Sequence, residues 1–132
     1  MPSQFSVNTR SSTEFVNVTS QVQNELQRTE VKNGVCTVYV PHTTAGITIN
    51  EGADPNVAKD ILMEINKMVP MQDGYTHSEG NSAAHIKTSL FGSSVQIPVE
   101  EGRLTLGTWQ SIFLCEFDGP RNRRVIVQVV GK

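Results

Sequence analysis

The C-terminal third of the sequence constrains the fold most, because it holds a series of strand-like stretches with very short connections between them. These stretches are rich in β-branched and aromatic residues or alternate with polar neighbours, and they cover residues 95–99, 103–106, 109–117 and 124–130. Only Glu100-Glu101-Gly102 and Asp118-Gly119-Pro120 bridge two of the gaps. Connections this short favour antiparallel pairing of the strands that they join.

The middle of the sequence adds two strands and one clear helix. The strands are expected at residues 35–40 and 46–49, both rich in β-branched residues. The helix begins at Asp54-Pro55, because an aspartate can cap free amides and proline fits the first helical position. Its apolar residues keep helical spacing until Pro70, so one face should pack on the sheet.

Two further helices have weaker patterns. One is expected over about residues 19–28, where Ser20 and Gln23 have the spacing of a capping box. A short one begins at Ser82 and carries His85. The order of elements predicts an α+β fold with mixed or antiparallel β-sheets and two or three helices, rather than a series of βαβ units.

The length of 132 residues fits one domain, residues 1–132, without repeats or long linkers. Hydrophobic residues make up 37% and charged residues 18%, which favours a folded chain over a disordered one. Cys36 and Cys115 lie far apart in apolar stretches and lack the close spacing of a redox or zinc pair. We interpret both as reduced packing residues.

The sequence also limits the partners of the protein. It has no run of about 18 apolar residues, and its first residues lack a basic segment followed by an apolar one, so we expect a cytoplasmic protein without a membrane partner. The net charge of −2 argues against nucleic acid, which needs a broad basic surface. The local cluster of Arg121, Arg123 and Arg124 is interpreted as a solvated hairpin tip or as a phosphate site.

The histidines His42, His77 and His85 are the main candidates for chemistry. His42 follows a predicted strand, while His77 and His85 flank a polar loop that must fold back to bring them together. Neutral imidazoles are common zinc ligands, and three of them with an open position are typical of a catalytic metal site. Their spacing leaves open the alternative of three separate surface or core histidines.

Carboxylates and amides occur near the same segments. Glu51 is interpreted as a metal ligand or as a general base, whereas Asp54 is better explained as a helix cap. Asn50 and Asn81 are candidates to orient a substrate by hydrogen bonding, although asparagines in loops often stabilise turns.

Three cationic residues and the adjacent Trp109 and Gln110 complete the candidate site. Lys87, Arg121 and Arg123 are the candidates for holding a phosphate or diphosphate. Trp109 and Gln110 are candidate substrate contacts, with the core as the alternative position for the indole.

Several motifs occur in an order that matches a known family. They are His42-Thr-Thr-Ala, Asn50-Glu51 with Asp54-Pro55, His77, His85-Ile-Lys87, Gly102-Arg103 and Gly107-Thr-Trp-Gln110. Through these motifs the chain, from about residue 35 to its end, resembles the YjbQ family of small bacterial and archaeal proteins, also described as secondary thiamine-phosphate synthases.

The resemblance implies an α+β fold, a homotrimer, and a metal site formed by His42, His77 and His85. It also implies a weak, secondary activity that joins a hydroxymethylpyrimidine diphosphate to a thiazole phosphate, with loss of pyrophosphate, to give thiamine phosphate. In that reaction Lys87 or an arginine would neutralise the leaving pyrophosphate, and Glu51 would orient the aminopyrimidine.

Two alternatives stay open because the metal and the reaction fit imperfectly. Three histidines suit zinc, whereas diphosphate transfer usually suits magnesium on oxygen ligands. One alternative is a zinc-type hydrolase in which the metal activates water and Glu51 is the base. The other is a trimer that binds a small phosphorylated metabolite or a metal without turnover.

Overall fold

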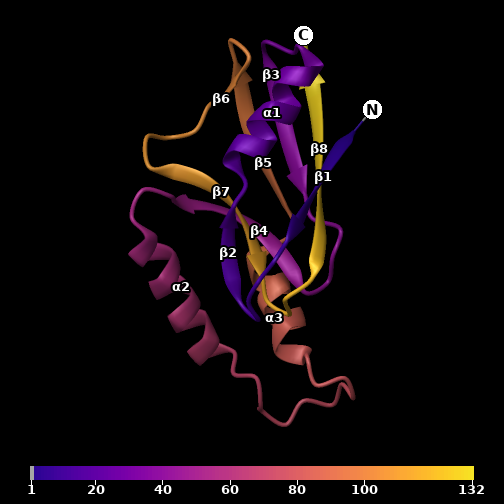
Figure 1. Ribbon diagram of the computed structural model, residues 1–132, viewed down its shortest axis with the longest axis vertical. Coiled ribbons are helices and arrows are strands. Elements are labelled where there is room, and N and C mark those ends of the chain that lie inside the picture. Colours follow the sequence, from indigo (N-terminus) through magenta and orange to yellow (C-terminus); the bar gives the residue numbers. More distant parts are fainter. Residues whose placement is uncertain (1) are drawn as a thin grey trace.

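Two β-sheets and three helices make up the structure, a computed structural model that describes residues 2–132 (Figure 1). The helices are α1 (Thr19–Thr29), α2 (Pro55–Met68) and α3 (Ser82–Phe91). The larger sheet contains β1 (Ser3–Asn8), β3 (Gly34–Tyr39), β5 (Ser94–Glu100), β6 (Arg103–Leu104) and β8 (Asn122–Gly131). The smaller sheet contains β2 (Glu14–Asn17), β4 (Ala45–Glu51) and β7 (Gln110–Glu116).

Both sheets are antiparallel, which confirms the α+β class. The strand order is β1-β8-β3-β5-β6 in the larger sheet and β2-β7-β4 in the smaller one. The hairpin predicted at Glu100-Glu101-Gly102 is confirmed, since Val99 pairs with Leu104 and Glu100 with Arg103.

The main core lies between the two sheets. It joins Cys36, Val38, Val125 and Val127 of the larger sheet to Ala45, Ile47, Ile112 and Leu114 of the smaller one. Helix α1 contributes Val22 and Leu26 to the same core, so it closes one end of the two-layer structure.

Side chains along β7 point alternately to the two faces of the smaller sheet, and those on the outer face pack on a third layer formed by helices. Ile112 and Leu114 belong to the main core, while Phe113 and Cys115 form a second cluster with Ala84 of α3. Opposite faces of one strand therefore bury residues against the larger sheet and against the helices. The interpretation of both cysteines as reduced packing residues is confirmed, because Cys36 and Cys115 are free and fully buried.

Helix α2 begins and ends as predicted. Its cap is Asp54, whose Oδ1 accepts a hydrogen bond from the Asn56 amide at 2.9 Å, and the helix ends before Pro70. Of the described residues of α2 only Ile65 is buried, and it packs on Val69 and on Ala83 of α3. The helix therefore packs on α3 as well as on the sheet.

The capping box predicted at Ser20 and Gln23 is wrong. The N-cap of α1 is Val18, and no side chain caps it. Gln23 instead donates to the Gly102 carbonyl at 3.1 Å and accepts from the Leu104 amide at 3.2 Å. Its side chain thus ties α1 to β6 and not to its own first turn.

A second correction concerns the connection at Asp118-Gly119-Pro120. The strands before and after it, β7 and β8, belong to different sheets and do not pair with each other. Backbone bonds to the N-terminal segment hold the crossing, from Gly119 to the Ser12 carbonyl at 3.0 Å and between Thr9 and Arg121 at 2.9 Å. The connection therefore carries the chain from one layer to the next.

The two N-terminal strands were not predicted. β1 pairs with β8 over its whole length, and β2 is only four residues long. Within residues 2–132, no helix is long and apolar enough to span a membrane.

Candidate functional site

His42 and His85 line one open polar pocket of about 520 Å³, together with Thr43, Thr88, Ser89, Gly92 and Ser93. The pocket forms where the β3–β4 connection meets α3 and the start of β5. Residues three and four apart on a helix share one face, so α3 presents His85, Thr88 and Ser89 to the same side. The hydroxyls were not predicted, although their spacing from His85 was the available signal.

His77 lies beside this pocket, next to His85, on the loop between α2 and α3. Its imidazole centroid lies 5.5 Å from that of His85, with the rings nearly perpendicular at 87°. The loop therefore folds back as the sequence required. On its exposed side, the His77 Nε2 lies 4.0 Å from a Glu79 carboxylate oxygen.

His42 is held as a neutral imidazole. Burial lowers its pKa, as do the positive charges of Arg123 and Arg124, against the smaller effect of Glu116. Its Nε2 accepts a hydrogen bond from the Arg124 amide at 2.9 Å. An Nε2 that accepts must be unprotonated, so Nδ1 carries the proton and is the donor that His42 retains.

The three histidines do not form a ready metal centre within one chain. Among the described residues, no group of three or more His, Cys, Asp or Glu side chains is placed to hold an ion. His77 and His85 are adjacent, but the Nε2 of His42 already accepts the Arg124 amide and its Nδ1 carries the proton, so neither nitrogen offers a free lone pair to an ion. The fit to a three-histidine site is therefore incomplete.

Arg123 forms a buried ion pair and does not take the predicted role of a phosphate ligand. It is only 4% exposed, and its guanidinium pairs with both carboxylate oxygens of Glu116. It also donates to the Thr44 hydroxyl at 2.9 Å, and Thr9 donates to Glu116 at 2.8 Å. A charge held this way can reach a ligand only by breaking the buried pair, so the phosphate role predicted for Arg123 is replaced by a structural one.

Arg121 and Asn81 meet at Asp118, beside the histidine loop. The Arg121 guanidinium donates to the Asp118 carbonyl at 2.7 Å and to its carboxylate at 3.0 Å. The Asn81 amide donates to the same carboxylate at 2.9 Å. Arg121 stays half exposed and Asn81 precedes α3, so both predicted residues lie at the end of the molecule that carries the histidines.

Lys87 points away from the pocket. It is 3% exposed, donates to the Asn66 side-chain oxygen at 2.6 Å, and lies 6.0 Å from the centre of the Phe117 ring. Burial lowers the pKa of its ammonium group. The role predicted for Lys87 beside a leaving pyrophosphate therefore does not match its position, which is between α2 and α3.

The remaining predicted residues form a second cluster at the other end of β4. Asn50, Glu51, Trp109 and Gln110 line a hollow of about 270 Å³ with Ile49. Glu51 pairs with Gln110 across β4 and β7, and the Glu51 carboxylate accepts from the Asp54 amide at 3.2 Å. Asn50 accepts from the Glu51 amide at 2.8 Å, but it lies in β4 and not in a turn.

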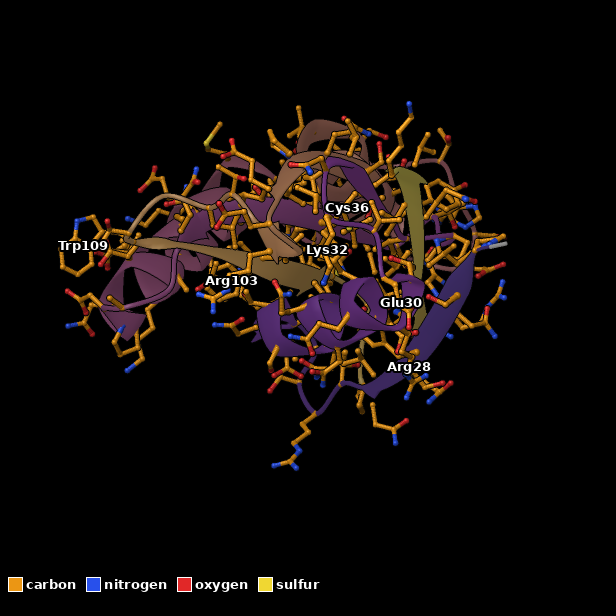
Figure 2. All side chains as sticks on the ribbon, turned by 90° about the horizontal axis from the view of Figure 1, so that it is seen from above. Arg28, Glu30, Lys32, Cys36, Arg103 and Trp109 are labelled. Carbon is orange, nitrogen blue, oxygen red and sulfur yellow. The ribbon has the colours of Figure 1, made fainter. Side chains whose placement is uncertain are left out.

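These two clusters are far apart in one chain. β4 runs from Ala45, just after His42, to Glu51, and six steps of about 3.4 Å span about 20 Å. Trp109 is 64% exposed and lies at an extremity of the molecule (Figure 2). What the sequence suggested as one site is thus a histidine pocket and, separately, a Glu51–Trp109 cluster.

The fold and the pocket together define a class of small α+β proteins. In this class helices pack on two antiparallel sheets, and an imidazole-lined pocket lies at one end. The family model described as "UPF0047 protein YjbQ-like" matches residues 3–132. The chain belongs to the YjbQ (UPF0047) family.

Individual relatives agree with this assignment. A UPF0047 protein of Methanocaldococcus jannaschii is 46% identical, over 96% of this chain and 92% of its own. A crystal structure of a YjbQ/UPF0047 protein from Clostridium acetobutylicum, described as uncharacterized, is 50% identical with a TM-score of 0.95 and covers 96% of this chain and 98% of its own. A Sulfolobus solfataricus protein described as of unknown function is 35% identical with a TM-score of 0.96, over 100% and 97% of the two chains.

Proposed function

We propose that the protein is a small-molecule transferase of the secondary thiamine-phosphate synthase kind, acting on a diphosphate and a phosphorylated acceptor. The observation that supports this proposal is the histidine pocket, in which His42 and His85 face one open polar space with His77 beside them. Hydroxyls and imidazole N–H groups are suitable donors to phosphate oxygens.

In the proposed reaction, the thiazole nitrogen attacks the methylene carbon of the pyrimidine diphosphate. A carbon–nitrogen bond forms, the carbon–oxygen bond breaks, and the bonding electron pair leaves with pyrophosphate. The main task of the protein is to bind and stabilise that leaving group. Ser93 can donate its hydroxyl proton to it, and neutral His42 can donate from Nδ1, whereas the Ser89 hydroxyl already donates to the His85 carbonyl at 3.0 Å.

A metal ion, a cytoplasmic location and a homotrimer are parts of the same proposal. Zinc suits His77 and His85 as imidazole ligands, and magnesium suits the oxygens of a diphosphate substrate. Because the ligand set is incomplete in one chain, no step above depends on an ion. Elemental analysis of purified protein should show about one metal per chain, and His77→Ala and His85→Ala variants should lose it.

The decisive experiment measures thiamine phosphate and pyrophosphate after incubation with hydroxymethylpyrimidine diphosphate and thiazole phosphate. The His85→Ala variant should slow product formation by about 100-fold, the usual effect of removing one preorganised donor. Glu100→Gln, on an exposed position of β5, is the matched control and should leave the rate unchanged.

A panel of esters and phosphoesters run in parallel separates the alternatives. Hydrolysis much faster than thiamine-phosphate formation would replace the transferase with a hydrolase. Pyrophosphate binding that His85→Ala abolishes, without turnover of any compound, would show a binding protein.

A further inference from the structure

We propose that the functional site is completed between two copies of this chain, with Trp109, Gln110 and Glu51 of one copy facing the histidine pocket of the next. The inference concerns the pocket of the proposed function, and so rests on that proposal for its substrate. The contact between copies is a separate physical claim that can be measured without any activity.

Each cluster lacks what the other has. The described residues lining the histidine pocket are histidines, threonines, serines and a glycine, without a carboxylate. The Glu51–Trp109 cluster has a carboxylate, two amides and an indole, without a cationic or imidazole group. About 20 Å of β4 separates the two ends, so one chain cannot place Glu51 and His85 on the same small ligand.

Trp109 is exposed to a degree that is typical of an interface residue in a separated subunit. It is the only tryptophan of the sequence, it is 64% exposed, and it stands at an extremity of the molecule (Figure 2). Indoles are enriched in protein interfaces, where burying one removes 150–250 Å² of mostly apolar surface from water. Gln110, beside it, is also exposed.

The histidine pocket has a matching apolar border. Ile86 and Leu90 lie one turn apart on α3 and are 39% and 61% exposed. They directly follow His85 and Ser89 in sequence, so this apolar strip runs alongside the pocket-facing side of the helix. An indole packed on Ile86 and Leu90 would bring Gln110 and Glu51 to the mouth of the pocket.

Charge supports the same pairing. Exposed Arg124 contacts His42 directly through its amide and has no ion pair among residues 2–132, whereas Arg121 is already paired with Asp118. Glu51 and exposed Asp54 lie at the opposite end, around the start of α2. Complementary charges of this kind favour contact between unlike ends of two copies over contact between like ends.

A contact between two different faces is heterologous, and such contacts repeat from copy to copy until a ring closes. A closed ring of three copies gives three equivalent sites and agrees with the homotrimer proposed above. The geometry thus assigns the two clusters to neighbouring copies rather than to two unrelated sites.

Cross-linking tests the contact directly. The Ile86→Cys/Trp109→Cys double variant should form covalent dimers and trimers under mild oxidation, because the two positions face each other between copies. Native Cys36 and Cys115 are fully buried and will not compete. The matched control, Gln96→Cys/Trp109→Cys, places the second thiol at an exposed position in the middle of β5 and should stay monomeric on a denaturing gel.

Cross-linking that is absent, or equal in the control, would overturn the shared site. All three positions lie on the surface, so the variants should fold, and circular dichroism identical to that of the parent protein checks this.

The single tryptophan gives a second readout. Its fluorescence should be shielded from iodide in the assembly of the parent protein and quenched by iodide in the Ile86→Glu variant. Full iodide access in the parent protein would also count against the contact.

Complementation connects the contact to activity. His85→Ala and Glu51→Gln variants should each lose thiamine-phosphate formation, and subunits of the two mixed in equal amounts should recover about one quarter of it, because random mixing restores that share of the sites. No recovery places the site within one chain. If the parent protein itself forms no thiamine phosphate, the proposed function fails while cross-linking still decides the shared site.

Discussion

Glu116 is fully buried on β7, where the Arg123 guanidinium, the Thr9 hydroxyl and the Asp118 amide all donate to its carboxylate. The pair joins a strand of the smaller sheet to β8 of the larger one. Through Thr44 it also reaches the residue two positions after His42. This network therefore fixes the base of the histidine pocket without touching a ligand.

Removing one partner of this pair should destabilise the protein strongly. Arg123→Ala leaves the Glu116 carboxylate buried without its counter-ion, which costs about 3–5 kcal/mol of unfolding free energy. Urea denaturation followed by circular dichroism measures the loss. Arg121→Ala, which breaks a half-exposed pair with Asp118, is the control and should cost about 0–1 kcal/mol. Equal losses in both variants would mean that the buried pair contributes little.

The same carboxylate predicts a pH dependence. Burial alone would raise the pKa of Glu116, but the bonds from Arg123, Asp118 and Thr9 outweigh it and lower the pKa below 4.5. A lowered pKa in the folded state gives stability that is present above the unfolded value and lost as the pH falls through the folded one. Urea midpoints should therefore fall below about pH 4.5 in the parent protein. The Glu116→Gln variant should be less stable at pH 7, and its urea midpoint should fall less steeply as the pH is lowered.

Individual side chains were the hardest feature to predict from sequence. Arg123 and Lys87 have the residue types of phosphate ligands, and nothing local distinguishes them from exposed cations. Their partners, Glu116 and Asn66, are set by tertiary packing, the second of them 21 residues away on another helix. Asp54 was predictable because its bond partner, the Asn56 amide, is local.

Among the elements, α2 buries few side chains: Ile65 is buried, Leu62 is partly buried against the Phe113–Cys115 cluster, and Asn66 accepts from Lys87. Its cap comes from Asp54, and Ile65 is the residue of the described helix that is buried. Elements with few buried contacts open locally at low free energy. We therefore expect α2 to exchange its amide hydrogens faster than the strands of the main core.

Removing the cap should expose this local opening. Asp54→Ala should cost about 1 kcal/mol, the usual value of an N-cap. Hydrogen exchange followed by mass spectrometry should show the change in residues 55–68, with the core strands unaffected. Asp60→Ala, an exposed carboxylate inside the same helix, is the matched control and should leave exchange nearly unchanged. Faster exchange throughout the chain would show instead that α2 is part of the global unfolding unit.

Most elements between residues 34 and 131 were predictable because their periodicity is local. Helices α2 and α3 and the strands of that region, like the earlier α1, lie within a few residues of their predicted positions. Sheet membership was not predictable, since β7 and β8 have the short connection of a hairpin yet pack in different layers. The separation of Glu51 from His42 has the same origin, because it depends on the direction in which β4 runs.

At the scale of the whole molecule, the two sheets share one core, and each contains one buried thiol. Cys36 lies on β3 in the larger sheet, and Cys115 lies on β7 in the smaller one. Burial raises the pKa of Cys36 to about 11 and also raises that of Cys115, so neither thiol reacts in the folded state. Each cysteine therefore reports when its own sheet opens.

If the two layers unfold as one cooperative unit, both thiols should become reactive at the same urea concentration. This expectation rests on the core shared by the two sheets, to which both Val38 and Ile47 belong, and on the Glu116–Arg123 pair that ties the layers together. Maleimide labelling followed by peptide mass spectrometry measures each cysteine separately. Arg123→Ala should lower both midpoints together, whereas labelling of Cys115 well before Cys36 would show that the smaller sheet and its helices unfold first.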